Sequence, residues 1–117
     1  MAKQNSEEFQ HEVRIVRSSD YQKLYKEGRK IHSEKFVLFG RENGIGHHRL
    51  GLTVSRKVGC AVVRNRIKRL FREIFRRSCR DIPGKLDIVV NAKAGCSSAR
   101  YLELRDEFLT AVRRICR

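Results

Sequence analysis

The spacing of the hydrophobic residues changes along the chain and predicts elements in the order α, β, β, α, β, α. The first twelve residues are polar and lack periodicity, so we expect residues 1–12 to form a flexible N-terminal arm and residues 13–117 to form one folded domain. Ser19-Asp20-Tyr21-Gln22 has the form of a capping box, and Gly28 ends the short helix that follows.

Two strands and a turn follow this helix. Residues 31–39 are rich in aromatic and β-branched side chains, while Leu50, Leu52 and Val54 alternate with small or polar residues. Asn43-Gly44 between them is a turn signal. The pattern predicts an antiparallel hairpin in which these two strands are neighbours.

The period becomes helical between Ala61 and about Cys79. Apolar residues at steps of three and four form one continuous stripe, which predicts a helix of about five turns. Pro83-Gly84 prevents its continuation. The stripe comprises Val63, Ile67, Leu70, Phe71, Ile74, Phe75 and Ser78.

A third strand and a last helix complete the pattern. Residues 86–91 read as a strand, and Ser97 or Ser98 can cap a C-terminal helix. One small central sheet with helices against it is the economical arrangement, so the predicted fold class is a single-domain α+β sandwich. The apolar face of the last helix comprises Tyr101, Leu104, Phe108, Val112 and Ile115.

The composition narrows the classes of function. Among 117 residues, 27 Lys and Arg against 13 Asp and Glu give a formal net charge of +14, which favours polyanionic partners. No apolar run is long enough to span a bilayer, and the start lacks a signal peptide, so we expect a cytoplasmic protein with no membrane partner. The four cysteines lack metal-ligand spacing, and we predict no metal site.

Half of the charge excess lies in one short segment. Residues 64–80 contain eight Lys and Arg and one acid, Glu73, which lies one turn from both Arg69 and Arg77. A solvated helix face is the ordinary interpretation of such a stripe. Here, however, like charges four residues apart repel by about 0.2–0.5 kcal/mol per pair, which favours polyanion binding. The cationic ridge opposite the apolar stripe comprises Asn65, Lys68, Arg69, Arg72 and Arg76.

Aromatic rings near this helix are candidates for stacking on unpaired bases. Tyr21 and Tyr25 lie one helical turn apart, and Phe36 and Phe39 lie in the first predicted strand. Rings at such spacings also occur in cores, and a regular strand can expose at most one of the two phenylalanines on a given face.

One continuous block of the sequence is specific enough to suggest a protein family. It is Gly51-Leu-Thr-Val-Ser-Arg-Lys-Val-Gly-Cys-Ala-Val-Val-Arg-Asn-Arg-Ile-Lys-Arg-Leu-Phe-Arg-Glu-Ile-Phe75. This block resembles the protein subunit of bacterial ribonuclease P, whose "RNR" motif is here Arg64-Asn65-Arg66. Further matches at residues 20–28, 36–39 and 86–90 extend the resemblance in order along the chain.

The resemblance implies a fold and a function. In the fold, the basic helix joins two strands through an unusual left-handed crossover, the opposite of the general rule. In the function, the holoenzyme removes the 5′ leader of precursor tRNA, and the RNA subunit carries out the cleavage with Mg²⁺ that it mainly holds itself. The implied partners are ribonuclease P RNA and precursor tRNA. No dedicated protein partner and no catalytic residue of the protein are predicted.

The resemblance also assigns two surfaces. Contact with the RNA subunit falls to the basic helix, and contact with the leader falls to a cleft between the first helix and the sheet. The two ring positions of the first helix are commonly Phe in the family and are Tyr here, which adds capacity for a hydrogen bond. The RNA-subunit set is Arg64, Asn65, Arg66, Lys68, Arg69 and Arg72, to which the ridge adds Arg76; the leader set is Tyr21, Tyr25, Phe36, Arg56, Lys57 and Lys93.

Three other functions fit parts of the sequence. A structural, ribosomal-type RNA-binding protein with no part in cleavage fits the size and charge equally well. A metal-dependent nuclease acting alone needs clustered carboxylates, whereas Asp20, Asp81 and Asp87 are scattered. DNA binding through residues 61–79 is disfavoured because the preceding segment reads as a strand.

Overall fold

Four strands form one mixed sheet in the spatial order β1-β2-β4-β3. The structure is a computed structural model that describes residues 14–116, so the predicted arm at residues 1–12 lies outside the described part. The elements are α1 (Ser18–Glu27), β1 (Arg29–His32), β2 (Phe36–Glu42), β3 (Arg49–Thr53), α2 (Ala61–Ser78), η2 (Cys79–Asp81), β4 (Leu86–Ala92), η3 (Ala94–Ser98) and α3 (Tyr101–Ile115).

The predicted hairpin between neighbouring strands is wrong. β4 lies between β2 and β3, antiparallel to the first and parallel to the second. The segment predicted as one strand at residues 31–39 is two strands, because the chain turns back between His32 and Phe36 and pairs β1 with β2. The β1–β2 pair is therefore the hairpin of this fold, and β3 is an edge strand.

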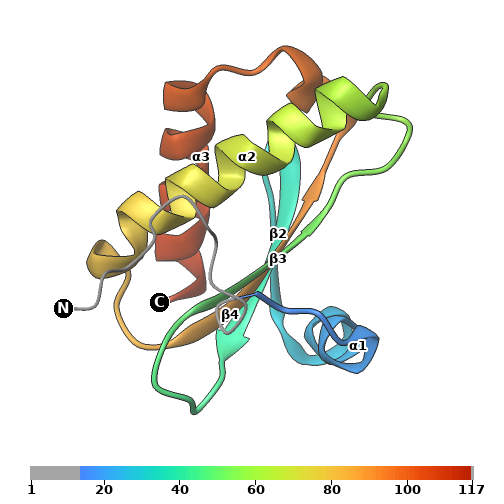
Figure 1. The fold of residues 1–117 in the computed structure, drawn as a ribbon. Helices are drawn as coiled ribbons and strands as arrows, with labels where there is room; N and C mark the ends of the chain where they lie inside the picture. The colour runs from blue at the N-terminus through green and yellow to red at the C-terminus, as the bar shows by residue number, and fades with distance from the viewer. Residues whose placement is uncertain (1–13, 117) are drawn as a thin grey trace, which may run out of the picture.

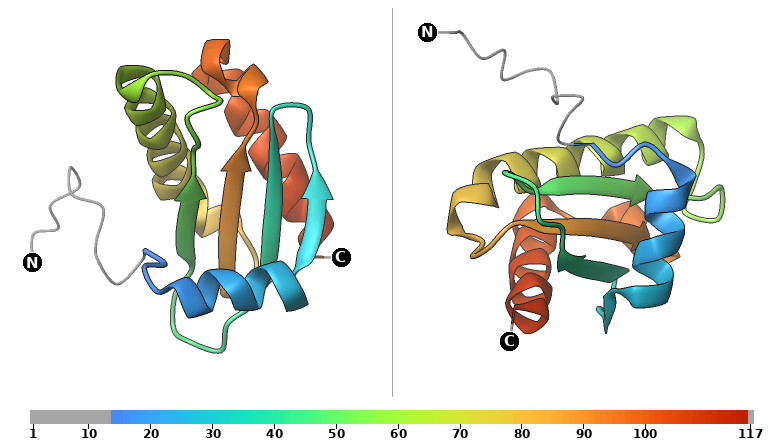
Figure 2. Two further views of the ribbon diagram at one scale, coloured as in Figure 1. Left: turned by 90° about the vertical axis from the view of Figure 1, so that its right-hand side faces the viewer. Right: turned by 90° about the horizontal axis from the view of Figure 1, so that it is seen from below.

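The basic helix makes the crossover between the parallel strands. In the left view of Figure 2, β4 stands to the right of β3, both strands point upwards, and α2 passes behind the sheet. A strand followed by a helix behind the sheet and a parallel strand to the right is a left-handed unit. The implied left-handed crossover is thus confirmed, against the general preference for right-handed connections.

The helices lie on both faces of the sheet. α2 and α3 cover one face, and α1 crosses the other (Figure 1). The main core lies on the α2 and α3 side, where Leu86, Ile88 and Val90 of β4 pack. A smaller cluster on the α1 side contains Ile15, Leu24, Phe39 and Val89. β4 is buried on both faces because it is central and covered twice, and the α+β class is confirmed.

The helix boundaries test the predicted caps. The helix predicted at residues 61–79 is confirmed as α2, with Ile67, Phe71 and Ile74 fully buried. The two predicted caps are wrong. α1 begins one residue before Ser19 with no side-chain cap bond, and α3 begins after Arg100, whose backbone N–H bonds the Glu103 carboxylate.

None of the helices within residues 14–116 has the length and apolar character that crossing a bilayer requires.

Candidate nucleic-acid interface

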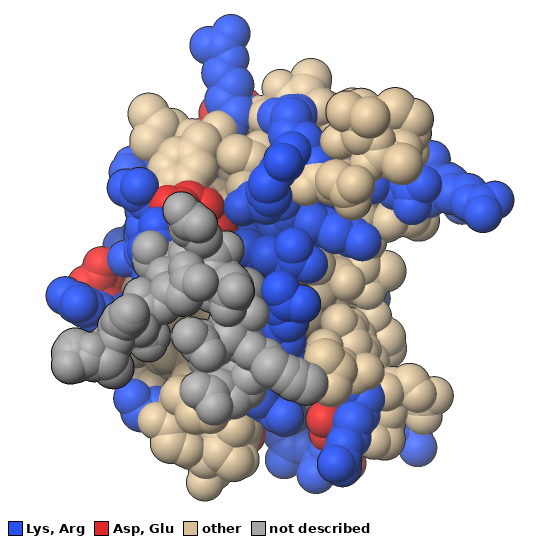
Figure 3. Space-filling model, viewed as in Figure 1, with Lys and Arg blue, Asp and Glu red and all other residues tan. Residues whose placement is uncertain are grey.

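The exposed part of the basic ridge is centred on the middle of α2. Asn65 and Arg69 are exposed and Lys68 is half-buried at its edge. Within residues 14–116, neither Lys68 nor Arg69 makes a hydrogen bond or an ion pair with another side chain. Figure 3 shows Lys and Arg gathered in a broad band across the face that contains α2. These cations are available to an external anion.

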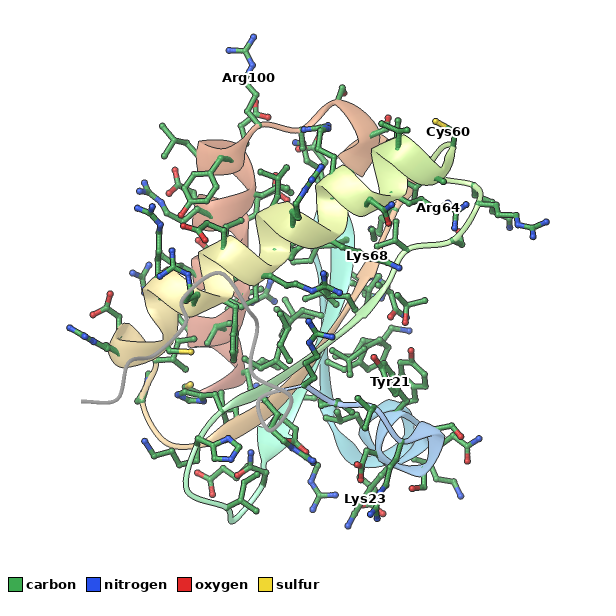
Figure 4. The ribbon with its side chains drawn as sticks, viewed as in Figure 1. Tyr21, Lys23, Cys60, Arg64, Lys68 and Arg100 are labelled. Carbon is green, nitrogen blue, oxygen red and sulfur yellow. The ribbon has the colours of Figure 1, made fainter. Side chains whose placement is uncertain are left out.

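The two arginines of the motif Arg64-Asn65-Arg66 point back to the protein. Arg64 donates from Nε to the Gly59 carbonyl at 3.2 Å, near the start of α2 (Figure 4). The Arg66 guanidinium donates to the carbonyl of Ser97 at 2.5 Å and to that of Ala99 at 3.4 Å. Arg66 therefore fastens α2 to the segment before α3, and its contact with the RNA subunit stays a prediction.

The C-terminal end of the ridge is partly neutralised. Arg76 donates two hydrogen bonds to the Glu73 carboxylate, at 3.2 and 2.6 Å, and Arg77 donates a further one. The predicted pairing of Glu73 with Arg77 is confirmed, but its second partner is Arg76 and not Arg69. The uncompensated charge of α2 consequently lies in its middle turns.

A second surface is formed by α1 and the sheet face beneath it. Alternate residues of the strands face α1, and the register puts Val37 of β2, Asn91 of β4 and Thr53 of β3 in one row across the sheet. These three side chains are half-buried or exposed. They form the uncovered floor beside α1, next to the row that contains the buried Phe39.

Tyr21 and Tyr25 project from α1 over this floor but differ in their surroundings. Their ring centroids are 6.4 Å apart. Tyr21 is half-buried against β3, and burial raises the pKa of its hydroxyl. Tyr25 is 41% exposed, packs edge-on against Phe39 at 4.8 Å, and donates to Asn91 Oδ1 at 3.2 Å. Tyr25 therefore offers the more accessible ring.

The predicted leader contact at Phe36 is wrong. Phe36 is 0% exposed and packs at right angles to Phe71, with ring centroids 5.4 Å apart, in the core on the α2 side. Adjacent strand residues point to opposite faces, so the side chains that share the cleft face are Val37 and Phe39. Phe39 takes the place expected of Phe36, at the base of the Tyr25 ring.

Of the three cations predicted to contact the leader, two are exposed and the third makes a hydrogen bond within the protein. Arg56 and Lys57 are exposed in the turn after β3. Because β3 and β4 are parallel, this turn lies at the same end of the sheet as Lys93, which follows β4. The Lys93 ammonium donates to the Ser33 carbonyl at 2.6 Å, so one of its N–H groups is used to hold the β1–β2 turn.

Sequence reasoning missed several residues of the cleft. Asn91 and Thr53 form its floor, and Lys30 and His32 of β1 pair with Phe39 and Val37 at its other edge. Only β1, which the pattern merged with β2, brings Lys30 and His32 there. The Lys30 ammonium lies 5.7 Å from the Phe39 ring centroid and adds a cation to this edge of the cleft.

A hollow at the edge of β3 joins the two surfaces. It is lined by Tyr21 of α1, by Lys68 and Arg72 of α2, and by Arg14 beside β3. Figure 4 shows Tyr21 rising from α1 towards α2, on the side where Lys68 lies. Burial, followed by the charge of Arg14, lowers the pKa of Arg72.

Comparison with known proteins identifies relatives of this chain. The family model described as Ribonuclease P matches residues 9–116. The ribonuclease P protein component of Thermotoga maritima is 37% identical over 114 residues, covering 94% of this chain and 97% of that protein. That of Desulfovibrio desulfuricans is 40% identical over 110 residues, covering 91% and 85%.

The chain belongs to the ribonuclease P protein family. Solved structures of this family share the fold. The ribonuclease P protein of Thermotoga maritima superposes with a TM-score of 0.79 at 38% identity, covering 87% of this chain and 96% of that one. A mutant ribonuclease P protein from Staphylococcus aureus gives 0.81 at 34% identity, covering 88% and 87%.

The block at residues 51–75, which carries the resemblance to the ribonuclease P protein family, contributes to both surfaces. It runs from β3 through the turn that holds Arg56 and Lys57 into α2, and so it contains parts of both surfaces. The assignment of individual residues to the RNA subunit or the leader stays a prediction.

Proposed function

We propose that this ribonuclease P protein binds the catalytic RNA through the exposed middle of α2 and the precursor tRNA leader through the α1 cleft, in the cytoplasm where precursor tRNA is made. The family role is 5′ leader removal together with the RNA subunit. One observation supports the assignment of two RNA ligands to two surfaces. The exposed cationic surface of α2 and the aromatic cleft beside α1 meet at the hollow lined by Tyr21, Lys68 and Arg72.

The cationic surface suits a folded RNA. Lys68 and Arg69 have no competing acid within the described residues, so their charges are free to neutralise phosphates. Arg72 lines the same hollow as Lys68, and a phosphate bound there would contact both cations. Arg69 at the centre and Asn65 one turn earlier extend the contact along the helix.

The cleft suits a single strand. Stacking of an unpaired base on an aromatic ring contributes about 1–3 kcal/mol, and Tyr25 has the accessible ring for it. Arg56 and Lys57 at the end of β3, and Lys30 at the β1 edge, lie where the phosphates of an extended leader would pass. Lys93 contributes through the N–H groups that Ser33 leaves unused.

Magnesium is assigned to the RNA subunit. Across residues 14–116, no three His, Cys, Asp or Glu side chains lie close enough together to hold a metal ion. The protein's part in this proposal is to reduce phosphate repulsion and to hold the leader while the RNA performs the cleavage.

Reconstitution tests the proposal. The purified protein is added to a bacterial ribonuclease P RNA, and cleavage of precursor tRNA is followed at a magnesium concentration too low for the RNA alone. The expected result is faster cleavage at the mature 5′ end, and a smaller gain with Arg69→Ala. Tight RNA binding with no change in cleavage rate would instead identify a structural RNA-binding protein.

A further inference from the structure

Glu107 of α3 holds the turn between β1 and β2. Its carboxylate accepts a hydrogen bond from the Ser33 hydroxyl at 2.5 Å and another from the Lys35 ammonium at 3.1 Å. Burial opposes ionisation of Glu107, but the bonds from Ser33 and Lys35 outweigh it and hold its pKa below the usual value. An ionised Glu107 therefore fixes both ends of the turn at residues 33–35.

The same turn holds Lys93. The backbone N–H of Lys93 donates to the Lys35 carbonyl at 2.9 Å, and its ammonium donates to the Ser33 carbonyl at 2.6 Å. The two residues whose side chains bond Glu107 thus bond Lys93 through their carbonyls. A continuous chain of hydrogen bonds therefore runs from α3 through the turn to Lys93.

Lys93 lies on the cleft side of the sheet. Alternate residues of β4 face α1, as Val89 and Asn91 do, and the backbone at Lys93 is still extended, with φ −93° and ψ 166°. The alternation therefore continues to Lys93. α3 packs on the other face of the sheet. A carboxylate on the α3 side consequently supports an ammonium on the α1 side.

We propose that Glu107 is a positioning residue for leader binding, which holds Lys93 where the phosphates of the leader pass. This inference rests on the proposed leader cleft. A lysine side chain is flexible, so an ammonium that is fixed before binding loses less entropy when it contacts a phosphate. One N–H group of the Lys93 ammonium bonds Ser33, and the other two can bond phosphate oxygens. Glu107 itself touches no RNA.

Glu34 distinguishes this role from a simple effect of charge. Its carboxylate lies 3.5 Å from the Lys35 ammonium and is 84% exposed. Within the described residues it makes no bond to Ser33. Glu34→Gln therefore removes one negative charge beside Lys35, as Glu107→Gln does, but leaves the turn attached to α3.

The test measures the affinity of reconstituted holoenzyme for precursor and mature tRNA over a range of salt concentrations. Glu107→Gln keeps an acceptor for Ser33 but places an amide N–H group, which cannot accept a hydrogen bond, beside Lys35. We expect precursor affinity to fall about fivefold and mature tRNA affinity to stay within about twofold. The salt-dependence slope for the precursor should fall by up to about 0.7, the value for one phosphate of a single strand. Glu34→Gln should stay within about twofold of the wild type on both substrates.

A double-mutant cycle connects Glu107 to Lys93. Lys93→Ala alone should weaken precursor binding at least as much as Glu107→Gln does. Glu107→Gln added to Lys93→Ala should then cost no more than about twofold further, because the residue that it positions is gone. Ser33→Ala removes one bond to the carboxylate by a smaller change, and it should give a loss between those of the wild type and Glu107→Gln.

The outcomes that overturn the inference differ from those that overturn the cleft. If Tyr25→Ala lowers the ratio of precursor to mature affinity but Lys93→Ala or Glu107→Gln does not, or if the losses of the last two add, Glu107 is not a positioning residue and the cleft survives. If none of these variants changes the ratio, the leader cleft itself is wrong. Thermal unfolding shows that folded proteins are compared, and Ser33→Ala supplies the test if Glu107→Gln is unfolded.

Discussion

Arg49 and Asp87 form a two-pronged ion pair between β3 and β4. Arg49 donates from Nε and from a terminal nitrogen to the two carboxylate oxygens, at 2.9 and 2.7 Å, and Asn43 adds a hydrogen bond at 2.8 Å. Another Arg49 nitrogen lies 3.7 Å from Asp20 in the first turn of α1. This network fixes α1, whose only buried residue is Leu24, to the sheet below the cleft.

Replacing Asp87 by Asn tests the contribution of this pair to stability. Burial opposes ionisation of Asp87, but the bonds from Arg49 and Asn43 outweigh it and hold its pKa below the usual value. Asp87→Asn leaves Arg49 with Asp20, at 3.7 Å, as its remaining acidic neighbour among the described residues, and we expect a loss of about 2–3 kcal/mol in the free energy of unfolding. Urea denaturation at pH 7 measures it. Asp106→Asn, which removes an exposed pair with Arg105, should cost less than about 1 kcal/mol.

Substitutions of Arg66 and Arg69 should distinguish a cation that stabilises the fold from a cation that binds RNA on the same helix. Arg69→Ala removes a free charge, so the slope of log K against log salt for the RNA subunit should fall by about 0.7–0.9. Arg66→Ala removes the bonds to Ser97 and Ala99, and it should lower stability by about 1–3 kcal/mol without changing that slope. Equal changes of the salt-dependence slope in the two variants would show that Arg66 also contacts the RNA subunit.

Gly51→Ala should displace Tyr21 while the core stays in place. A Cβ atom at residue 51 would lie 2.7 Å from the Tyr21 hydroxyl oxygen and 2.9 Å from the adjacent ring carbon. The phenol must move into solvent, and its pKa, which burial raises, should return towards the usual value of about 10. Ultraviolet titration of the tyrosines detects this shift. Gly46→Ala, in an open loop, is the control, and an unchanged titration in Gly51→Ala would show that the ring is not held there.

His48 should make stability depend on pH. It is buried beside Phe75, accepts from the Leu86 N–H at 2.9 Å and contacts the Ile82 carbonyl at 3.2 Å. Burial lowers its pKa below the unfolded value of about 6.5. The unfolded chain therefore binds more protons than the folded one below that pH, and the free energy of unfolding decreases as the pH falls through about 6.5.

Urea denaturation between pH 8 and pH 5.5 measures this dependence. His48→Gln should show a flatter profile than the wild type, because the titrating ring is gone. His32→Gln, which removes an exposed histidine of β1, is the matched control. A profile that is equally steep in His48→Gln would assign the pH dependence to other groups.

Local periodicity predicted the helices well but not the strand order. The stripe from Val63 to Ser78 specifies α2 because it depends on spacing within one segment. The position of β4 depends on pairing between distant segments, and the usual preference of consecutive strands to be neighbours led to the wrong hairpin. One signal was present: Ile88, Val89 and Val90 are consecutive apolar residues, which is typical of a strand buried on both faces.

The sequence predicted where charged residues gather on α2, but it did not predict the directions in which individual side chains point. Arg69 is exposed on α2 as the helical projection indicates. Arg66 precedes Arg69 by only three residues but bonds to the carbonyls of Ser97 and Ala99. The sequence pattern does not show that the segment containing these two residues lies beside α2. Phe36 and Phe39 cannot be told apart by composition, since only the register with β4 shows which face holds the larger core.

The most direct test of the account compares the affinity of the reconstituted holoenzyme for precursor tRNA and for mature tRNA. Tyr25→Ala should weaken precursor binding by roughly tenfold, as expected for one lost stack, and leave mature tRNA binding within about twofold. Arg69→Ala should instead weaken assembly with the RNA subunit and leave the ratio of the two affinities unchanged. An equal loss for precursor and mature tRNA in Tyr25→Ala would contradict the leader cleft.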